Sequence, residues 1–171
     1  MIIMGIDPGI ATVGYGFIST DGVSQSLIAT GVIETPAGKY VDERLNIIYD
    51  DLTELIKTYK PTEVAIEELF FNTNSKTAIG VAEARGVILL CCRQQALTIA
   101  EYTPIQVKNS VTGNGRAEKI QVQSMVKTLL GLKAIPKPDD AADALALAIC
   151  HATCGASRIQ DFYNGRKKKL V

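Results

Sequence analysis

The hydrophobic pattern of the N-terminal part of the chain predicts three antiparallel strands. Residues 1–6 are mostly apolar and lead into an Asp-Pro-Gly sequence, as expected of a buried strand that ends in a turn. Apolar and small residues alternate over residues 12–20, which indicates a second strand joined to the first by a hairpin. Residues 24–35 continue with a third strand-like segment. Because the connections are short, we expect an antiparallel meander.

The next part of the chain alternates between helical and strand periodicity. Apolar side chains recur at helical spacing over residues 41–59, and a strand-like segment follows at residues 62–68. A second helical pattern covers residues 73–95 and precedes a fifth strand at residues 97–102. The two strands flank a helix, and this βαβ arrangement implies that they pair in parallel.

Three further helices are expected in the C-terminal part. One begins at Thr103-Pro104 with capping residues, one covers residues 122–130, and one runs from Pro138 to about residue 153. The prediction is an α/β fold with a mixed five-stranded sheet flanked by helices. We expect one domain at residues 1–157 and a basic, flexible tail at residues 158–171.

The second long helix contains a stretch, residues 87–92, that is apolar on every side. A helix that is apolar all round must be covered all round. We therefore expect one side of this stretch to face the sheet and the other to face a partner subunit.

Composition narrows the class of protein. Nearly half of the 171 residues are apolar, which predicts a packed globular domain. No apolar run is long enough to span a membrane and the N-terminus has no signal-peptide pattern, so a cytoplasmic location is expected. The formal net charge is zero, without the basic excess that is usual in nucleic-acid-binding proteins. However, Lys108, Arg116 and Lys119 gather in one segment, so a neutral total is compatible with one basic face.

The four cysteines are expected to be reduced, buried thiols. Cys150, His151 and Cys154 are close in sequence, but zinc is disfavoured because no second Cys/His pair follows at ligand spacing. His151 itself is expected to be a hydrogen-bonded residue at the end of a helix and not a catalyst.

Several carboxylates at the ends of predicted elements have ordinary structural interpretations. Asp7 follows the first strand, where an Asp is usually a turn residue. Glu67 and Glu68 end the fourth strand on opposite faces, and either could be a solvent-facing acid. Asp140 lies in the first turn of the last helix, where an acid interacts favourably with the helix dipole.

Asp143 does not fit such an interpretation. It lies one turn after Asp140 in a helix that is otherwise apolar, and a buried carboxylate is costly unless it is paired or bound to a metal. No Lys or Arg close in sequence relieves the two acids, whereas a divalent cation would. Ligation by carboxylates alone selects a hard ion such as Mg²⁺ or Mn²⁺. Two such ions could activate water for phosphodiester hydrolysis.

Five short motifs are spread in order over most of the chain, and they are Gly5-Ile6-Asp7-Pro8-Gly9 with Gly14-Tyr15-Gly16; Ala65-Ile66-Glu67 with Phe70; Ala84-Arg85-Gly86-Val87; Val107-Lys108 with Ala117-Glu118-Lys119 and Gln121-Val122-Gln123; and Asp140-Ala141-Ala142-Asp143-Ala144-Leu145-Ala146. Together they resemble the motifs of the RuvC family of Holliday-junction resolvases, which has a ribonuclease-H-like fold. One motif alone, such as Asp-Pro-Gly, would be a weak signal, but the combination is specific.

The resemblance implies a metal-dependent endodeoxyribonuclease that binds Mg²⁺, with Mn²⁺ able to substitute, and two ions per active site. Its four catalytic and metal-binding carboxylates fall on Asp7, Glu67, Asp140 and Asp143. The resemblance thus selects Glu67 over Glu68, a choice that the strand pattern leaves open.

The resemblance also implies residues that contact DNA. Phe70 matches an aromatic residue that stacks on a base at the junction centre, although the neighbouring Phe71 offers a second ring. Asn74 matches a polar position near the DNA, and Lys108 and Lys119 match basic residues near the scissile phosphate. We add Arg116 to the candidate DNA-binding residues from the basic segment.

Family membership would further imply a homodimer that makes paired symmetric nicks in a four-way DNA junction during recombination and repair. It would also imply cooperation with the branch-migration proteins RuvA and RuvB.

Three alternatives deserve comparison. A YqgF-type ribonuclease shares the fold and the opening motif, but lacks the later segment that carries Lys108 and Lys119 here. An actin-like ATP-binding protein needs two such domains, and 171 residues supply one. A junction-binding protein that does not cut would gain nothing from a set of acids facing phosphates.

Overall fold

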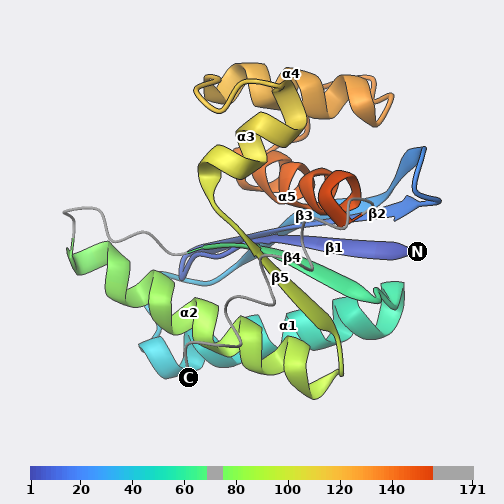
Figure 1. The fold of residues 1–171 in the computed structure, drawn as a ribbon. Coiled ribbons are helices and arrows are strands. Elements are labelled where there is room, and N and C mark those ends of the chain that lie inside the picture. The colour runs from blue at the N-terminus through green and yellow to red at the C-terminus, as the bar shows by residue number, and fades with distance from the viewer. Residues whose placement is uncertain (69–74, 156–171) are drawn as a thin grey trace, which may run out of the picture.

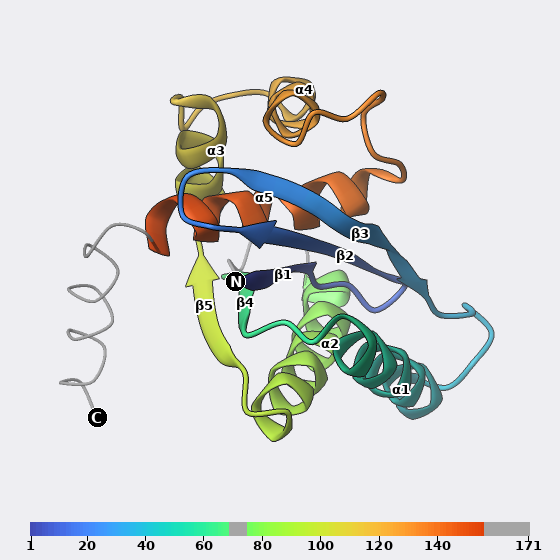
Figure 2. The same ribbon diagram turned by 90° about the vertical axis from the view of Figure 1, so that its right-hand side faces the viewer.

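The computed structural model describes residues 1–68 and 75–155, which form a twisted sheet between two layers of helices (Figures 1 and 2). The five strands are β1 (Ile2–Asp7), β2 (Thr12–Thr20), β3 (Gln25–Glu34), β4 (Glu63–Glu67) and β5 (Thr98–Tyr102). Their order in the sheet is β3-β2-β1-β4-β5. The first three strands are antiparallel neighbours, whereas β4 is parallel to both β1 and β5. The predicted meander and the predicted parallel βαβ unit are therefore both confirmed.

The helices lie on the two faces of this sheet. They are α1 (Val41–Tyr59), α2 (Ser75–Gln94), α3 (Pro104–Thr112), α4 (Lys119–Leu129) and α5 (Asp139–Gly155). Helices α1 and α2 cover one face, α5 lies across the other, and α3 and α4 pack on the outside of α5 (Figure 1). Within the described ranges, no helix is both long enough and apolar enough to cross a membrane.

Local sequence explains where the helices begin and which sides they bury. In α1, Ile48, Leu52 and Ile56 recur every four residues and are buried against the sheet. At the start of α3, the Thr103 side chain accepts a hydrogen bond from the backbone of Gln106, and the Gln106 side chain accepts one from the backbone of Thr103. This capping box confirms the helix start expected from the sequence.

Small residues allow α5 to lie directly on the sheet. A Cβ atom added to Gly5 on β1 would be 1.9 Å from the carbonyl oxygen of Ala144, and one added to Gly14 on β2 would be 2.1 Å from that of Asp140. The facing positions Ala144 and Ala148 on α5 are fully buried. Helix and strands therefore approach more closely than larger side chains permit, and the acidic start of α5 comes to lie beside the end of β1.

The apolar stretch of α2 is covered on one side only within the described chain. Ile88, Cys91 and Cys92 are buried, but Leu90 is 54% exposed and Ile79, on the same helix, is 64% exposed. One side of the stretch is thus covered within this chain, as expected, and the partner expected on the other side stays a prediction.

Three of the four cysteines and the histidine are buried, as expected, whereas Cys154 is not fully buried. All four cysteines are free thiols, and Cys154 alone is partly exposed. The buried ring of His151 is hydrogen-bonded on both sides, by Nδ1 to the Tyr102 hydroxyl at 2.7 Å and by Nε2 to the Glu63 carboxylate at 2.5 Å. This pairing confirms a structural role for His151.

Candidate active site

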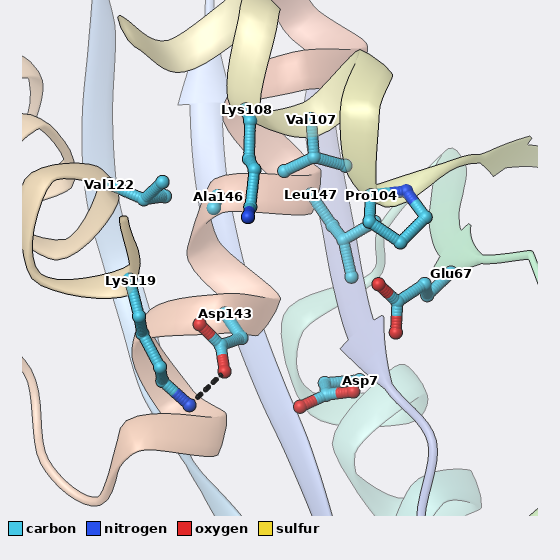
Figure 3. Close-up of a pocket in the computed structure, with 10 residues that line it drawn as sticks. All are labelled: Asp7, Glu67, Pro104, Val107, Lys108, Lys119, Val122, Asp143, Ala146 and Leu147. Carbon is cyan, nitrogen blue, oxygen red and sulfur yellow. Dashed lines mark ion pairs between the residues drawn. The ribbon is translucent and has the colours of Figure 1, made fainter. Parts of the chain in front are cut away.

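Three predicted carboxylates meet in one pocket at the edge of the sheet (Figure 3). Asp7 is the last residue of β1 and Glu67 is the last residue of β4. Because these neighbouring strands are parallel, their carboxyl ends meet at the same edge, which is where open α/β sheets bind ligands. Asp143 reaches the pocket from the second turn of α5. The pocket has a volume of about 250 Å³.

The other walls of the pocket come from α3, α4 and α5. Lys108 on α3 and Lys119 on α4 both extend into it (Figure 3). The remaining lining side chains are mostly apolar, and they are Pro104, Val107, Val122, Ala146 and Leu147. The pocket therefore combines carboxylates from the ends of β1 and β4 and from α5, apolar walls, and two ammonium groups from the outer helices.

Burial and the repulsion of neighbouring acids raise the pKa values of Asp7 and Glu67. Burial, followed by the repulsion of Glu67, Asp143 and Asp140, raises the pKa of Asp7 to about 7, while Lys119 opposes this rise. The pKa of Glu67 is also raised, first by burial and then by Asp143. Such a group of acids in a pocket has an excess of negative charge that a bound cation would relieve.

Lys119 supplies part of that relief. Its Nζ lies 2.7 Å from Oδ2 of Asp143 and 3.7 Å from Oδ2 of Asp139. The hydrogen bond to Asp143 is the main reason that the pKa of Lys119 is raised. The sequence showed no basic residue close to Asp143 along the chain, and this partner was not foreseen because the two residues lie 24 positions apart and meet only in the folded structure.

The donors present suit a hard divalent cation, since all are carboxylate oxygens. In the present conformation, residues 1–68 and 75–155 contain no cluster of three or more Asp, Glu, His or Cys side chains close enough to hold an ion. Asp143 is engaged by Lys119, and the partly buried Asp140 is absent from the pocket lining although it is close enough to raise the pKa of Asp7.

The other candidate DNA-binding residues lie away from this pocket or outside the described residues. Arg116 is exposed in the loop between α3 and α4, where its backbone N–H donates to the side chain of Asn114. Phe70 and its alternative Phe71, like Asn74, fall outside the described residues.

Arg85 is a residue near the site to which the sequence patterns assigned no role. Its Nε donates a hydrogen bond to the backbone carbonyl of Glu67 at 3.2 Å, and its guanidinium forms an ion pair with Glu101 on β5. The signal available in the sequence was the motif Ala84-Arg85-Gly86-Val87, in which an arginine stands between two small residues.

Comparisons with known proteins point to one family. The family model described as "Crossover junction endodeoxyribonuclease RuvC" matches residues 3–151. A protein of that name from Caldicellulosiruptor saccharolyticus is 56% identical over 158 residues, which cover 92% of this chain and 95% of the relative. The protein of that name from Fusobacterium nucleatum is 48% identical over 171 residues, covering all of this chain and 90% of the relative.

Solved structures agree with the sequence comparison. Thermus thermophilus RuvC in complex with a Holliday junction substrate superposes with a TM-score of 0.87 at 35% identity, over 91% of this chain and 95% of that one. The yeast mitochondrial Holliday junction resolvase Ydc2 has a TM-score of 0.68 at 15% identity, covering 98% of this chain and 84% of that one, and shares the fold. The fold is thus the ribonuclease-H-like α/β fold expected from the sequence.

Proposed function

This chain belongs to the RuvC family of crossover junction endodeoxyribonucleases, and we propose that the pocket between β1, β4 and α5 is where it cuts four-way DNA junctions. One observation carries the proposal: Asp7, Glu67 and Asp143, from three distant segments, line a single pocket together with Lys108 and Lys119. The YqgF-type ribonuclease is not favoured, because the RuvC family model matches most of the chain.

The family depends on a divalent metal, and we propose Mg²⁺, with Mn²⁺ as a substitute and two ions per site. Asp7, Glu67, Asp140 and Asp143 would hold the metal, with Asp140 one turn before Asp143 on the same face of α5. A metal bound there would supply an activated water and stabilise the leaving oxygen of the phosphodiester. The carboxylates suit this role because Asp7, Glu67 and Asp143 line one pocket, and a cation bound there would relieve the repulsion that helps to raise the pKa of Asp7 and Glu67.

The two lysines have a separate role in this proposal. Lys108 and Lys119 lie on the outer wall of the pocket, opposite the ends of β1 and β4 (Figure 3). A DNA phosphate entering the pocket would meet two ammonium groups that offset the acids. We also retain Arg116, Phe70 and Asn74 as proposed DNA contacts, with Phe70 stacking on a base.

A homodimer is the proposed assembly, because a four-way junction offers two equivalent strands to two symmetric active sites. The exposed apolar residues Ile79 and Leu90 on α2 support this helix as part of the contact. We further propose that the protein acts with RuvA and RuvB in the cytoplasm. We also propose that it consists of a nuclease domain at residues 1–157 and a basic tail at residues 158–171.

Cleavage of three labelled substrates tests the proposed function. With Mg²⁺, the protein should nick a four-way DNA junction in two symmetric strands while leaving linear duplex DNA and RNA largely intact. Efficient hydrolysis of RNA with no junction cleavage would support the ribonuclease alternative. Junction binding without any cleavage, at all Mg²⁺ and Mn²⁺ concentrations, would support a binding protein that does not cut.

A further inference from the structure

The side chain of Arg85 connects α2 to the end of the strand that carries Glu67. It lies in the middle of α2 and its side chain is only 13% exposed. Nε donates to the carbonyl oxygen of Glu67 at 3.2 Å, while a terminal guanidinium nitrogen pairs with Oε2 of Glu101. We propose that Arg85 is a positioning residue that holds the Glu67 peptide so that its carboxylate points into the pocket. This inference rests on the proposed role of Glu67 as a metal ligand.

The hydrogen bonds at the end of β4 explain why the contact from Arg85 matters. Glu67 is the last residue of β4, and the following peptide N–H, that of Glu68, donates to the carbonyl oxygen of Tyr102 on β5. The contact from Arg85 fixes the carbonyl of that same peptide, so its N–H and C=O have separate partners. When both groups of a peptide are held, the direction of the preceding side chain is restricted.

Glu101 fixes the guanidinium itself. It pairs in register with Ile66, the residue before Glu67, so the acid stands beside the end of β4. A largely buried guanidinium needs its donors satisfied, and the planar fork of arginine can address two partners at once. Glu101 therefore anchors Arg85, and Arg85 in turn anchors Glu67.

The arrangement resembles the outer partners that orient ligands in metal sites, whose loss typically weakens metal binding roughly 10–100-fold. Arg85 touches neither the pocket nor a reacting atom, and it is absent from the pocket lining. It also belongs to α2, the helix proposed for the dimer contact, and so ties that helix to a ligand strand.

Direct metal binding by the full chain without DNA tests the inference. Mn²⁺ is titrated into metal-free protein and free Mn²⁺ is followed by electron paramagnetic resonance. Arg85→Gln should weaken binding by roughly 10–100-fold, while circular dichroism and sedimentation match the wild type. Arg93→Gln removes an exposed arginine from the same helix and should bind Mn²⁺ like the wild type. Unchanged binding by Arg85→Gln would overturn the inference.

Arg85→Lys separates positioning from stability. Lysine keeps the positive charge beside Glu101, but its single nitrogen cannot make both contacts of the guanidinium fork. Even if Arg85→Gln fails to fold, folded Arg85→Lys should bind Mn²⁺ weakly and regain the wild-type cleavage rate when Mn²⁺ is in excess. Wild-type Mn²⁺ affinity in Arg85→Lys, or a rate that stays low at all Mn²⁺ concentrations, would contradict a positioning role.

Glu67→Gln in the same titration distinguishes the role of Glu67 as a metal ligand from the role of Arg85 in positioning it. It should lose most of the Mn²⁺ binding if Glu67 is a ligand. Wild-type binding by Glu67→Gln would overturn the site assignment and the inference with it. Loss in Glu67→Gln together with wild-type binding in both Arg85 variants would overturn the inference alone.

Discussion

At the scale of single residues, Asp7 shows how the fold changes the chemistry of a side chain. An Asp after a strand is usually a turn residue with an ordinary acidity. Here burial, followed by the repulsion of Glu67, Asp143 and Asp140, raises its pKa to about 7. The side chain therefore takes up a proton within the pH range in which the enzyme would work, unless a cation neutralises the pocket.

This acidity predicts the pH dependence of stability without metal. The folded-state pKa lies above the unfolded value, so the folded state binds the extra proton between about pH 4 and pH 7. The contribution of Asp7 to the free energy of unfolding is fully present below about pH 4 and is lost as pH rises to about 7. Each unit of difference between the folded and unfolded pKa corresponds to about 1.4 kcal/mol. Urea unfolding in EDTA should show that the wild type loses more stability than Asp7→Asn between about pH 5 and pH 8. Parallel losses in the two proteins would contradict the environment assigned to Asp7.

Lys119 gives a second prediction at this scale. Its ammonium group lies 2.7 Å from Asp143 at the pocket wall, so Lys119→Met should greatly reduce junction cleavage and flatten the dependence of junction binding on salt. Lys133→Met removes an exposed lysine outside the pocket and serves as the matched control. Equal effects of the two substitutions on cleavage at saturating Mg²⁺ would show that only overall charge matters.

The sequence predicted these residues unevenly. The apolar surroundings of Asp143 indicated a carboxylate in need of a partner, but its ion pair with Lys119 depends on how α4 packs on α5, which periodicity does not reveal. The strand pattern did not decide whether Glu67 or Glu68 is the carboxylate of the site, and in the structure Glu67 lines the pocket. Arg85 was unassigned because its partners lie on two other elements, β4 and β5.

At the scale of elements, the contact of α5 with β1 and β2 determines where the acids lie. The hydrophobic pattern predicted all five strands and five helices of the described chain, with ends that differ by a few residues. The closeness of α5 to the sheet was not predictable from periodicity. It depends on glycines such as Gly14, which faces the carbonyl of Asp140 across the interface.

Gly14→Ala tests the importance of this close contact. The added methyl would lie 2.1 Å from the Asp140 carbonyl oxygen, so the start of α5 must shift. Overpacking of this kind typically costs about 1–3 kcal/mol, and displacement of Asp140 and Asp143 should also weaken Mn²⁺ binding. Gly38→Ala, at a position where a Cβ meets nothing within 4 Å, is the control and should leave both quantities unchanged. A Gly14→Ala variant with wild-type stability and Mn²⁺ affinity would show that α5 does not set the site.

At the scale of the whole molecule, α2 leaves an apolar strip that one described chain does not cover. Ile79 and Leu90 are both more than half exposed, whereas Ile88 on the opposite side is buried. The sequence predicted a partner from the all-round apolar pattern. It could not indicate which side of the helix the sheet would leave free, because that depends on how α2 packs against α1 and β5.

Leu90→Glu should dissociate the proposed dimer, because it buries a charge in an apolar contact. Sedimentation velocity at micromolar concentration should shift from dimer to monomer, and paired nicking of the junction should be replaced by slow single nicks. Val23→Glu places the same charge on an almost fully exposed apolar residue in the β2–β3 turn and should remain dimeric. A dimeric Leu90→Glu variant would locate the contact elsewhere, and a monomeric wild type would refute the dimer.

Junction cleavage by Asp143→Asn tests the central claim most directly. The substitution keeps the size of the side chain but removes the charge that would hold a metal at the wall of the pocket opposite Asp7 and Glu67. With saturating Mg²⁺ and a labelled four-way junction, the variant should bind the junction at least as tightly as the wild type, because one repulsive charge is removed, and should show no measurable cleavage. Cleavage within about tenfold of the wild type, equivalent to less than about 1.4 kcal/mol in the barrier, would contradict the assignment of this pocket as the active site.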